Sequence, residues 1–368
     1  MIGSVDRRCS GRAGEWAMGD RGMRAWRVHE YGEPGAVLRM EEVASPEPGP
    51  GEVRVRVQAI PLNLNDLERI TGGNMMARPE FPYSPGMEAF GIVDACGAGA
   101  EHLEGRRVAA ITRQAIGGFA EQAICPAVAA FEIPDDIPLP DAAALLFPFH
   151  LAWLGLVDRA DLRPGQSVLV HAAAGGSGSA AVQLAKARGA TVFATAGGAD
   201  KVALCRDLGA DVAIDYMSED FVEIVLDATD GRGVDVVFDN VGEAVLEGSF
   251  KCIAYGGHHL MMGFASNKVV ADEPFIVPRQ VIMGNFKLCG VLLNYQSDDM
   301  IGLIKRGMGW NVAPRSLGER ATAEIVELVR SGAVRAVVGS TPSFEALPAA
   351  ITAMAERNTM GRVIVGVE

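Results

Sequence analysis

Three glycines, Gly175, Gly176 and Gly178, separate a short apolar run from an alanine-rich segment. The apolar run, residues 167–170, has the pattern of a buried strand, and residues 180–188 have that of a helix. Glycine lets the backbone turn tightly and approach a ligand, and the free N–H groups at a helix N-terminus attract anions. This strand, turn and helix predict a binding site for the pyrophosphate of a dinucleotide, and an ordinary tight turn of an α/β core is the alternative.

The next strand indicates which dinucleotide is bound. NAD-binding folds place a carboxylate about 20 residues past the glycines, where it binds the ribose 2′-hydroxyl. Here the second strand, residues 191–196, is followed by Gly197, and no carboxylate stands at its tip. Lys201 comes shortly afterwards and can supply the charge that a 2′-phosphate needs, although a solvated lysine at a helix start is the alternative. The pattern favours NADPH over NADH.

Charge and cysteine usage exclude several classes of partner. The 368-residue chain has a net charge of −13 and no run of Lys or Arg. A negative chain disfavours broad contact with nucleic acid or an anionic membrane, so we expect neither partner. The six cysteines contain no C-x-x-C pair, which argues against a disulfide framework or a cysteine-rich zinc module. We expect a cytoplasmic protein with a small-molecule substrate.

The chain divides into segments of different pattern. Residues 1–22 lack the apolar core of a signal peptide and are expected to be a disordered extension, or to precede a true start at Met23. Residues 23–147 carry short alternating strands broken by Pro and Gly, and residues 148–292 alternate strands with helices. Residues 293–368 are expected to return and complete the first domain. The repeated βα units predict an α/β fold with a doubly wound parallel sheet.

Three further segments have clear patterns. Residues 260–262 predict one later strand of the parallel sheet, and residues 287–292 predict the last. Residues 321–330 have the amphipathic pattern of a helix, which we expect in the returning segment.

Short motifs occur here in the order in which a known family has them: Pro85-Gly86-Met87-Glu88, Gly117-Gly118-Phe119-Ala120-Glu121, the glycine turn, and Gly361-Arg362-Val363. Across residues 23–368 the chain resembles the medium-chain dehydrogenase/reductase superfamily, in its zinc-free NADPH:quinone oxidoreductase branch. The resemblance implies a GroES-like, β-rich catalytic domain interrupted by a Rossmann domain, with the active site between them. It also implies a homodimer formed through an edge strand at residues 288–292.

The residues at the family's metal positions argue against zinc. Catalytic zinc needs three protein ligands drawn from Cys, His and carboxylates. Zinc-dependent relatives have a Cys where this chain has Asn63 and a His-Glu pair where it has Met87 and Glu88. The adjacent pair His258 and His259 lies at the start of a predicted strand, whose successive side chains point to opposite faces. We therefore expect no metal at either place.

Hydride transfer from NADPH to a quinone or another α,β-unsaturated carbonyl fits a site without a metal. The resemblance places Asn63 against the substrate or the nicotinamide ring, and Asp66 as an orienting residue, with a helix cap as the alternative for Asp66. His150 is a candidate acid, or a packed core side chain. Leu151 stands where many relatives carry a Thr. That departure keeps open the alternative of an NADPH-binding sensor or structural protein without turnover.

The cofactor residues that the pattern and the resemblance imply lie in the glycine turn, at the ends of later strands and in the tail. They are Ala174, Gly175, Gly176, Ser177, Gly178, Thr195, Gly197, Lys201, Tyr216, Asn240, Val241, Gly263, Phe264, Val291 and Arg357. Ser177 takes the place of the family's usual Val and adds a hydroxyl near the pyrophosphate. A surface arginine is the alternative for Arg357.

Overall fold

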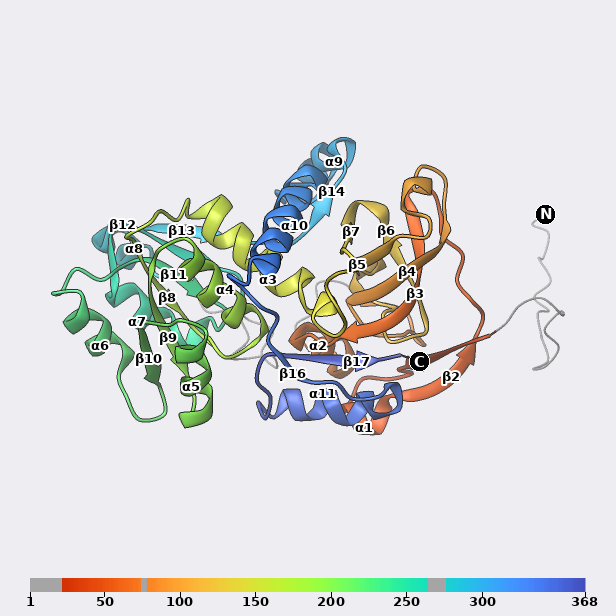
Figure 1. The fold of residues 1–368 in the computed structure, drawn as a ribbon, viewed down its shortest axis with the longest axis horizontal. Helices are drawn as coiled ribbons and strands as arrows, with labels where there is room; N and C mark the ends of the chain where they lie inside the picture. The colour runs from red at the N-terminus through yellow and green to blue at the C-terminus, as the bar shows by residue number, and fades with distance from the viewer. Residues whose placement is uncertain (1–21, 74–77, 264–275, 368) are drawn as a thin grey trace, which may run out of the picture.

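The computed structural model describes residues 22–73, 78–263 and 276–367, and its fold is built around two large sheets (Figure 1). A six-stranded sheet with its helices forms one end of the molecule, and a seven-stranded sheet forms the other. The chain passes from the second sheet to the first and back, so that the C-terminal strand lies beside strands from the N-terminal half (Figure 1).

The six-stranded sheet is parallel throughout and has the order β10-β9-β8-β11-β12-β13. Its strands are β8 (Ser167–Val170), β9 (Thr191–Ala196), β10 (Val212–Asp215), β11 (Val234–Asp239), β12 (Ile253–Met261) and β13 (Lys287–Gly290). Its helices are α4 (Gly176–Ala187), α5 (Ala199–Asp207), α6 (Phe221–Ala228), α7 (Glu243–Lys251) and α8 (Pro278–Gly284). The strand order reverses between β8 and β11, which is where doubly wound sheets bind ligands. The predicted Rossmann fold is confirmed.

Two boundaries in this sheet differ from those predicted. Helix α4 begins at Gly176 rather than at residue 180, because the turn residues themselves form its first turn. Strand β12 begins at Ile253 rather than at residue 260. Gly256, with a φ of +74°, reads as a strand breaker in the sequence. The strand continues through it as an irregularity, and its register against β11 jumps between Ile253 and His258.

The seven-stranded sheet has the order β16-β17-β3-β4-β5-β7, with β6 also paired to β3. Its strands are β3 (Glu52–Pro61), β4 (Glu88–Cys96), β5 (Arg107–Ile111), β6 (Gln122–Pro126), β7 (Ala130–Glu132), β16 (Val338–Ser340) and β17 (Arg362–Gly366). Alternation along β3 buries Val53, Val55 and Val57 and leaves Arg56 exposed. Strand β17 pairs antiparallel with β3, so the tail and the N-terminal half share one sheet.

Smaller elements surround this sheet. A hairpin of β1 (Met23–Arg27) and β2 (Arg39–Val43) lies at its edge, and the helices α1 (Pro34–Val37), α2 (Leu64–Thr71) and α11 (Leu347–Ala355) pack together. Helix α3 (Leu146–Trp153) connects the two sheets and continues as a π-helical segment, Leu154–Arg159. These elements carry several of the candidate site residues.

The segment after β13 contains more helix than the sequence indicated. Strands β14 (Tyr295–Gln296) and β15 (Ala313–Pro314) enclose helix α9 (Asp298–Met308), which was not predicted. Helix α10 (Arg315–Arg330) begins six residues before the predicted start at residue 321 and packs against α3. Both helices stand beside the junction of the two halves (Figure 1).

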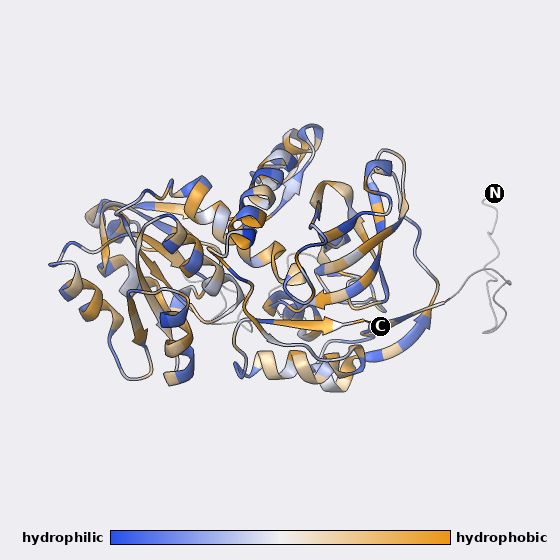
Figure 2. Ribbon diagram, viewed as in Figure 1, coloured by the Kyte–Doolittle hydropathy of each residue, from blue (hydrophilic) through white to orange (hydrophobic). Residues whose placement is uncertain are grey.

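Apolar residues gather on the strands and on the inner faces of the helices, while polar residues cover the outer helix faces (Figure 2). The largest buried cluster runs from β8 and α4 through α3 to β4 and α10, so it joins the two halves. In the described part of the chain, no helix combines the length and the apolar character needed to cross a membrane.

Candidate active site

The glycine turn leads from β8 into the N-terminus of α4. Gly175 precedes the helix with an extended backbone, and its N–H donates to Ala172 O at 3.0 Å. A Cβ on Gly178 would lie 2.2 Å from Ala172 O, and a Cβ on Gly176 would lie 2.7 Å from Arg362 Cδ. Both positions therefore need glycine. The first turn of this 12-residue helix lies at the reversal of the strand order, and N–H groups at such an N-terminus attract anions.

The C-terminal segment holds this turn in place. The Gly361 N–H donates to Ala174 O at 2.8 Å, and Gly361 forms an isolated parallel bridge with Gly175. Gly361 has a φ of +61°, and a Cβ there would lie 2.2 Å from Val337 O. The glycine turn of one sheet is thus bonded directly to the start of β17 in the other.

Three buried polar side chains connect the turn with the predicted catalytic segment. Arg362, which begins β17, donates from Nη1 to Asn63 Oδ1 at 2.8 Å and pairs through Nη2 with Glu88. Asn63 Nδ2 donates to Glu88 Oε2 at 2.8 Å, and the Phe147 N–H donates to Glu88 Oε1 at 3.1 Å. Arg362, Glu88 and Asn63 are 6%, 1% and 5% exposed. A guanidinium, a carboxylate and a carboxamide here satisfy one another in the interior.

This network fixes the role that Asn63 can play. Its amide oxygen faces a cation and its amide nitrogen faces a carboxylate, so the reverse orientation would be repulsive. The second amide hydrogen is directed at Pro61 O, 3.3 Å from Nδ2. The carboxamide is therefore occupied within the protein, and the structure favours a positioning role for Asn63 over a direct bond to a substrate oxygen.

Asp66 takes part in the capping of α2, although the N-cap itself is Asn63 and not Asp66. It is the third residue of α2, and its Oδ2 accepts the N–H of the cap residue Asn63 at 2.9 Å. Its Oδ1 accepts the Met87 N–H at 2.9 Å, which ties α2 to the segment before β4. Burial raises the pKa of Asp66 from 3.8 to about 6. The predicted N-cap position was therefore wrong by three residues, and the orienting role of Asp66 stays a prediction.

We expect Asp66→Asn to remove a pH-dependent component of stability. Because burial raises the pKa of Asp66 to about 6, the folded chain holds a proton at pH values where the unfolded chain has already lost it. The unfolding free energy of the wild type should fall relative to that of Asp66→Asn by up to roughly 3 kcal/mol between about pH 4 and about pH 7. Urea unfolding of both proteins across this range measures the difference, and a constant difference would contradict the assignment.

His150 lies in the interior of α3. Its Nδ1 is 2.9 Å from the Tyr295 hydroxyl oxygen, and Thr322 Oγ1 is 3.2 Å from its Nε2. Burial lowers the pKa of His150 to about 3, so the ring is neutral at physiological pH. Phe131 packs on the same ring, with centroids 5.1 Å apart. This environment favours the packed alternative over the candidate acid, and the neighbouring Leu151 is buried as well.

The residues predicted near a 2′-phosphate form two contacting pairs, Gly197 with Tyr216 and Lys201 with Arg357. Tyr216 places its hydroxyl over Gly197, where a Cβ would lie 2.6 Å from the phenolic oxygen. Lys201, in α5, donates from Nζ to the carbonyl oxygen of Arg357 at 2.8 Å. The Asp215 carboxylate ends β10 in the same corner, where its Oδ1 accepts the N–H groups of Gly198 and Met217, each at 3.0 Å. Arg357 belongs to the exposed turn after α11 and has a φ of +60°.

Thr195 turns its side chain away from this corner. Its hydroxyl lies 3.0 Å from Nδ1 of the buried His171, and its carbonyl oxygen accepts the Ala173 N–H at 3.0 Å. Only 2% of Thr195 is exposed. We therefore leave Thr195 out of the side-chain contacts that we propose for a cofactor.

The remaining predicted cofactor residues follow the carboxyl ends of β11, β12 and β13. The Val241 N–H donates to Asp239 Oδ1 at 2.8 Å, and the Val291 N–H donates to Met261 O at 2.9 Å. Gly263 packs so closely on Asn240 that a Cβ would lie 2.5 Å from Asn240 O. The predicted residue Phe264 falls outside the described residues.

Reasoning from the sequence missed the part that Arg362 and Asp239 play. Arg362 was noticed only as a motif letter, and Glu88 only as a possible metal ligand. The signal that would have indicated Arg362 is its charge directly before the apolar run 363–365. Asp239 ends a buried strand, and an acid at that position favours a cap on the following turn.

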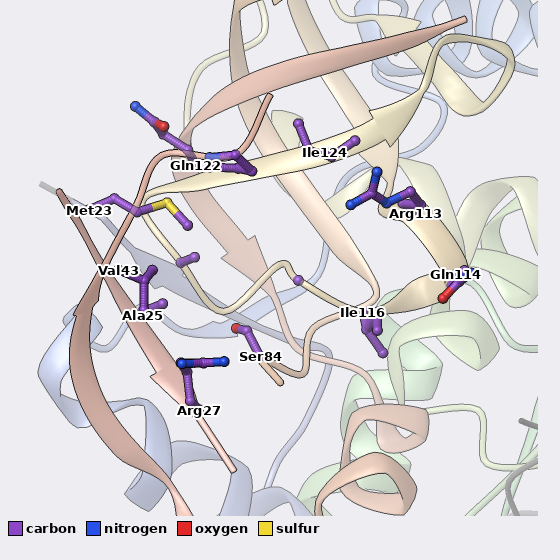
Figure 3. A pocket seen from close by; sticks show the side chains of 13 residues that line it. Met23, Ala25, Arg27, Val43, Ser84, Arg113, Gln114, Ile116, Gln122 and Ile124 are labelled. Carbon is purple, nitrogen blue, oxygen red and sulfur yellow. The ribbon is translucent and has the colours of Figure 1, made fainter. Parts of the chain in front are cut away.

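A separate pocket of about 410 Å³ lies between the β1–β2 hairpin and the 113–117 segment (Figure 3). Its basic lining residues already have acidic partners, since Arg27 pairs with Glu41 and Arg113 with Glu52. None of the predicted site residues lines it. Among residues 22–73, 78–263 and 276–367, no group of three His, Cys, Asp or Glu side chains is placed to hold a metal ion.

Comparison with known proteins identifies the family to which this architecture belongs. Residues 49–135 match the family described as alcohol dehydrogenase GroES-like domain, and residues 176–306 match the family described as zinc-binding dehydrogenase. A quinone oxidoreductase of Pseudomonas aeruginosa is 34% identical over 75% of this chain and 86% of its own length. A 2-haloacrylate reductase of Burkholderia is 30% identical over 92% of this chain and 97% of its own length.

A solved mycobacterial protein in complex with NADPH has the same fold. It is 30% identical, with a TM-score of 0.80 over 94% of this chain and 99% of its own. The chain therefore belongs to the medium-chain dehydrogenase/reductase superfamily, in its quinone oxidoreductase branch, and is an oxidoreductase.

Proposed function

We propose that the protein transfers hydride from NADPH to a quinone or another α,β-unsaturated carbonyl, without zinc. The observation that carries this proposal is the glycine turn at the start of α4, which is bonded to Gly361 and backed by Arg362. The mycobacterial neighbour was solved with NADPH, and the two relatives are named for a quinone and for an activated alkene. Both compounds are electrophilic before they meet the enzyme.

The residues at the turn fit a dinucleotide. Gly176 and Gly178 leave a cradle that a Cβ would fill, and Arg362 Nε is buried without a partner among the described residues. The first-turn N–H groups of α4 and the Ser177 hydroxyl would bind the pyrophosphate, and Lys201, Tyr216 and Arg357 would bind a 2′-phosphate. When bound, NADPH supplies the hydride.

The donor set favours a reaction without zinc. Asn63 and Met87 stand at two of the family's metal positions, and neither side chain is a usual zinc ligand. The third, Glu88, is already paired with the Arg362 guanidinium. A second cation beside that guanidinium would be repelled. The protein therefore orients the coenzyme and the substrate with fixed polar side chains. The hydride is transferred to a carbon that is already electrophilic.

Proton delivery in this proposal comes from water. Hydride adds to the conjugated carbon, the electron pair of the broken π bond moves to the carbonyl oxygen, and water protonates that oxygen. The two buried groups that could have served as acids are otherwise engaged, since His150 is neutral and Asp66 holds two backbone N–H groups. The alternative of a sensor without turnover still has Leu151 in its favour, a side chain without the hydroxyl that relatives place there.

The test uses purified protein treated with EDTA. We expect loss of NADPH absorbance with at least one member of a panel of quinones and enones, at a rate that added zinc does not increase. No NADPH oxidation with any acceptor, together with tight NADPH binding, would favour the sensor alternative. Activity that appears only on addition of zinc would contradict the metal-free proposal.

We also propose a homodimer through β13. This strand is the edge of the parallel sheet, and exposed apolar side chains lie beside it on β12 and α8, among them Tyr255, Ile282 and Met283. Light scattering after size-exclusion chromatography is expected to give twice the mass of one chain. The variant Ile282→Lys is expected to shift the measured mass toward that of a single chain. The mass of one chain for the wild type would overturn this proposal.

A cytoplasmic location is proposed from the thiols. The five cysteines that the structure describes are unpaired, and Cys125, Cys205 and Cys252 are buried. Unpaired thiols suit a reducing compartment. Fractionation of the source cells with an antibody tests this location, and recovery outside the cytoplasm would contradict it.

A further inference from the structure

A buried carboxylate and a buried imidazole lie close together near the carboxyl ends of β11 and β12. Asp239 ends β11 and is 2% exposed, and His259, in β12, is fully buried. His259 Nε2 lies 3.2 Å from Asp239 Oδ2. The strands pair Val237 with His259 and Asp239 with Met261, so the two side chains lie two positions apart on neighbouring parallel strands. Phe250 of α7 packs against the imidazole at 5.2 Å between ring centroids.

The other oxygen of Asp239 organises the loop that follows β11. Its Oδ1 accepts the N–H groups of Val241 and Gly242, each at 2.8 Å. Gly242 has a φ of +89° and precedes helix α7. One carboxylate therefore sets the path of the chain from the strand into the loop and the helix.

His259 supplies the side-chain contact to the second oxygen of the Asp239 carboxylate. The nearby His171 is occupied, because its two ring nitrogens lie 3.0 Å and 2.9 Å from the hydroxyl oxygens of Thr195 and Ser249. His259 Nδ1 is buried and has no partner among the described residues. An orphaned polar atom in the core costs stability, and an aliphatic side chain in this buried strand would avoid that cost. The imidazole offsets that cost through the contact of its Nε2 with the Asp239 carboxylate.

We propose that His259 is a positioning residue, which through Asp239 holds the loop at residues 240–242 ready for the coenzyme. The loop begins at the end of β11, next to the reversal of the strand order, so it borders the site that the glycine turn defines. This inference rests on the proposed function for the identity of the coenzyme. It does not depend on turnover, and it assigns a purpose to one member of the adjacent histidine pair.

The test compares His259→Leu with His259→Gln, which keeps an N–H donor, and with the matched control His258→Leu. His258 points to the opposite face, where its Nε2 lies 3.1 Å from Lys287 Nζ. Loss of a hydrogen bond to a buried carboxylate changes an equilibrium constant by roughly tenfold. We expect His259→Leu to speed amide hydrogen exchange of Val241 and Gly242 about tenfold and to raise the Kd for NADPH by a similar factor.

The conservative variant His259→Gln is expected to retain most of the wild-type exchange protection and affinity, and His258→Leu all of both. If wild-type protein binds NADPH and His259→Leu binds it equally well with unchanged exchange, the role of His259 is overturned. If the wild type itself fails to bind NADPH, the proposed function falls instead. A thermal melt identifies a variant that is unfolded, and His259→Gln then decides the question.

Discussion

Gly178→Ala is expected to lower the affinity for NADPH by about 100-fold. The added Cβ would lie 2.2 Å from Ala172 O, a backbone atom that has no side-chain freedom with which to move away. The turn must then shift, and the loss of two hydrogen bonds to the charged pyrophosphate, at about 1.5 kcal/mol each, corresponds to about 100-fold in Kd. Fluorescence titration with NADPH measures the change.

The matched control for this variant is Gly307→Ala. Gly307 lies in α9, and a Cβ there meets no atom within 4 Å. Alanine at that position is expected to leave NADPH affinity unchanged and to stabilise the helix slightly. Equal affinity in Gly178→Ala and the wild type would mean that the coenzyme does not use this turn.

Arg362→Met is expected to destabilise the fold by about 3–5 kcal/mol, because it leaves the Glu88 carboxylate buried without its cation. The matched control is Arg330→Met, which removes an exposed guanidinium from Asp136 and Glu327 and should leave the unfolding free energy nearly unchanged. Urea unfolding measures both. A cost for Arg362→Met as small as that of the control would show that the buried network contributes little.

The double variant Arg362→Met with Glu88→Gln separates stability from function. Removing both charges should recover most of the unfolding free energy, since no uncompensated ion remains in the core. NADPH turnover should stay low, because the guanidinium that backs the glycine turn and holds the Asn63 carboxamide is still absent. Full recovery of turnover in the double variant would contradict the link between the network and the site.

Most of the fold could be predicted from the local pattern of the sequence. The strand of residues 167–170, the glycines after it and the alternating β3 could be predicted because short-range chemistry dictates each of them. The start of β12 could not, since Gly256 breaks strands in general and is accommodated here only by a local irregularity between neighbouring strands. Helix α9 was missed for a related reason. Two glycines inside it, Gly302 and Gly307, disfavour helix in general, and the helix forms here all the same.

The candidate site divides in the same way. The turn residues followed from backbone geometry, and the structure places Tyr216 against Gly197 and Lys201 against Arg357. The contacts of Asn63 and Thr195 did not follow, because each depends on a partner far away in sequence, Arg362 for one and His171 for the other. Sequence spacing indicates which residues are near a site, while only the fold shows which of their atoms are already in use.

The most direct measurement is isothermal titration calorimetry of the metal-stripped protein with NADPH and with NADH. We expect one NADPH per chain, bound more tightly than NADH, with no change on addition of zinc. Heat signals that are the same for buffer and NADPH, or binding that appears only after zinc is restored, would contradict the central claim that a phosphorylated nicotinamide coenzyme occupies the start of α4 unaided.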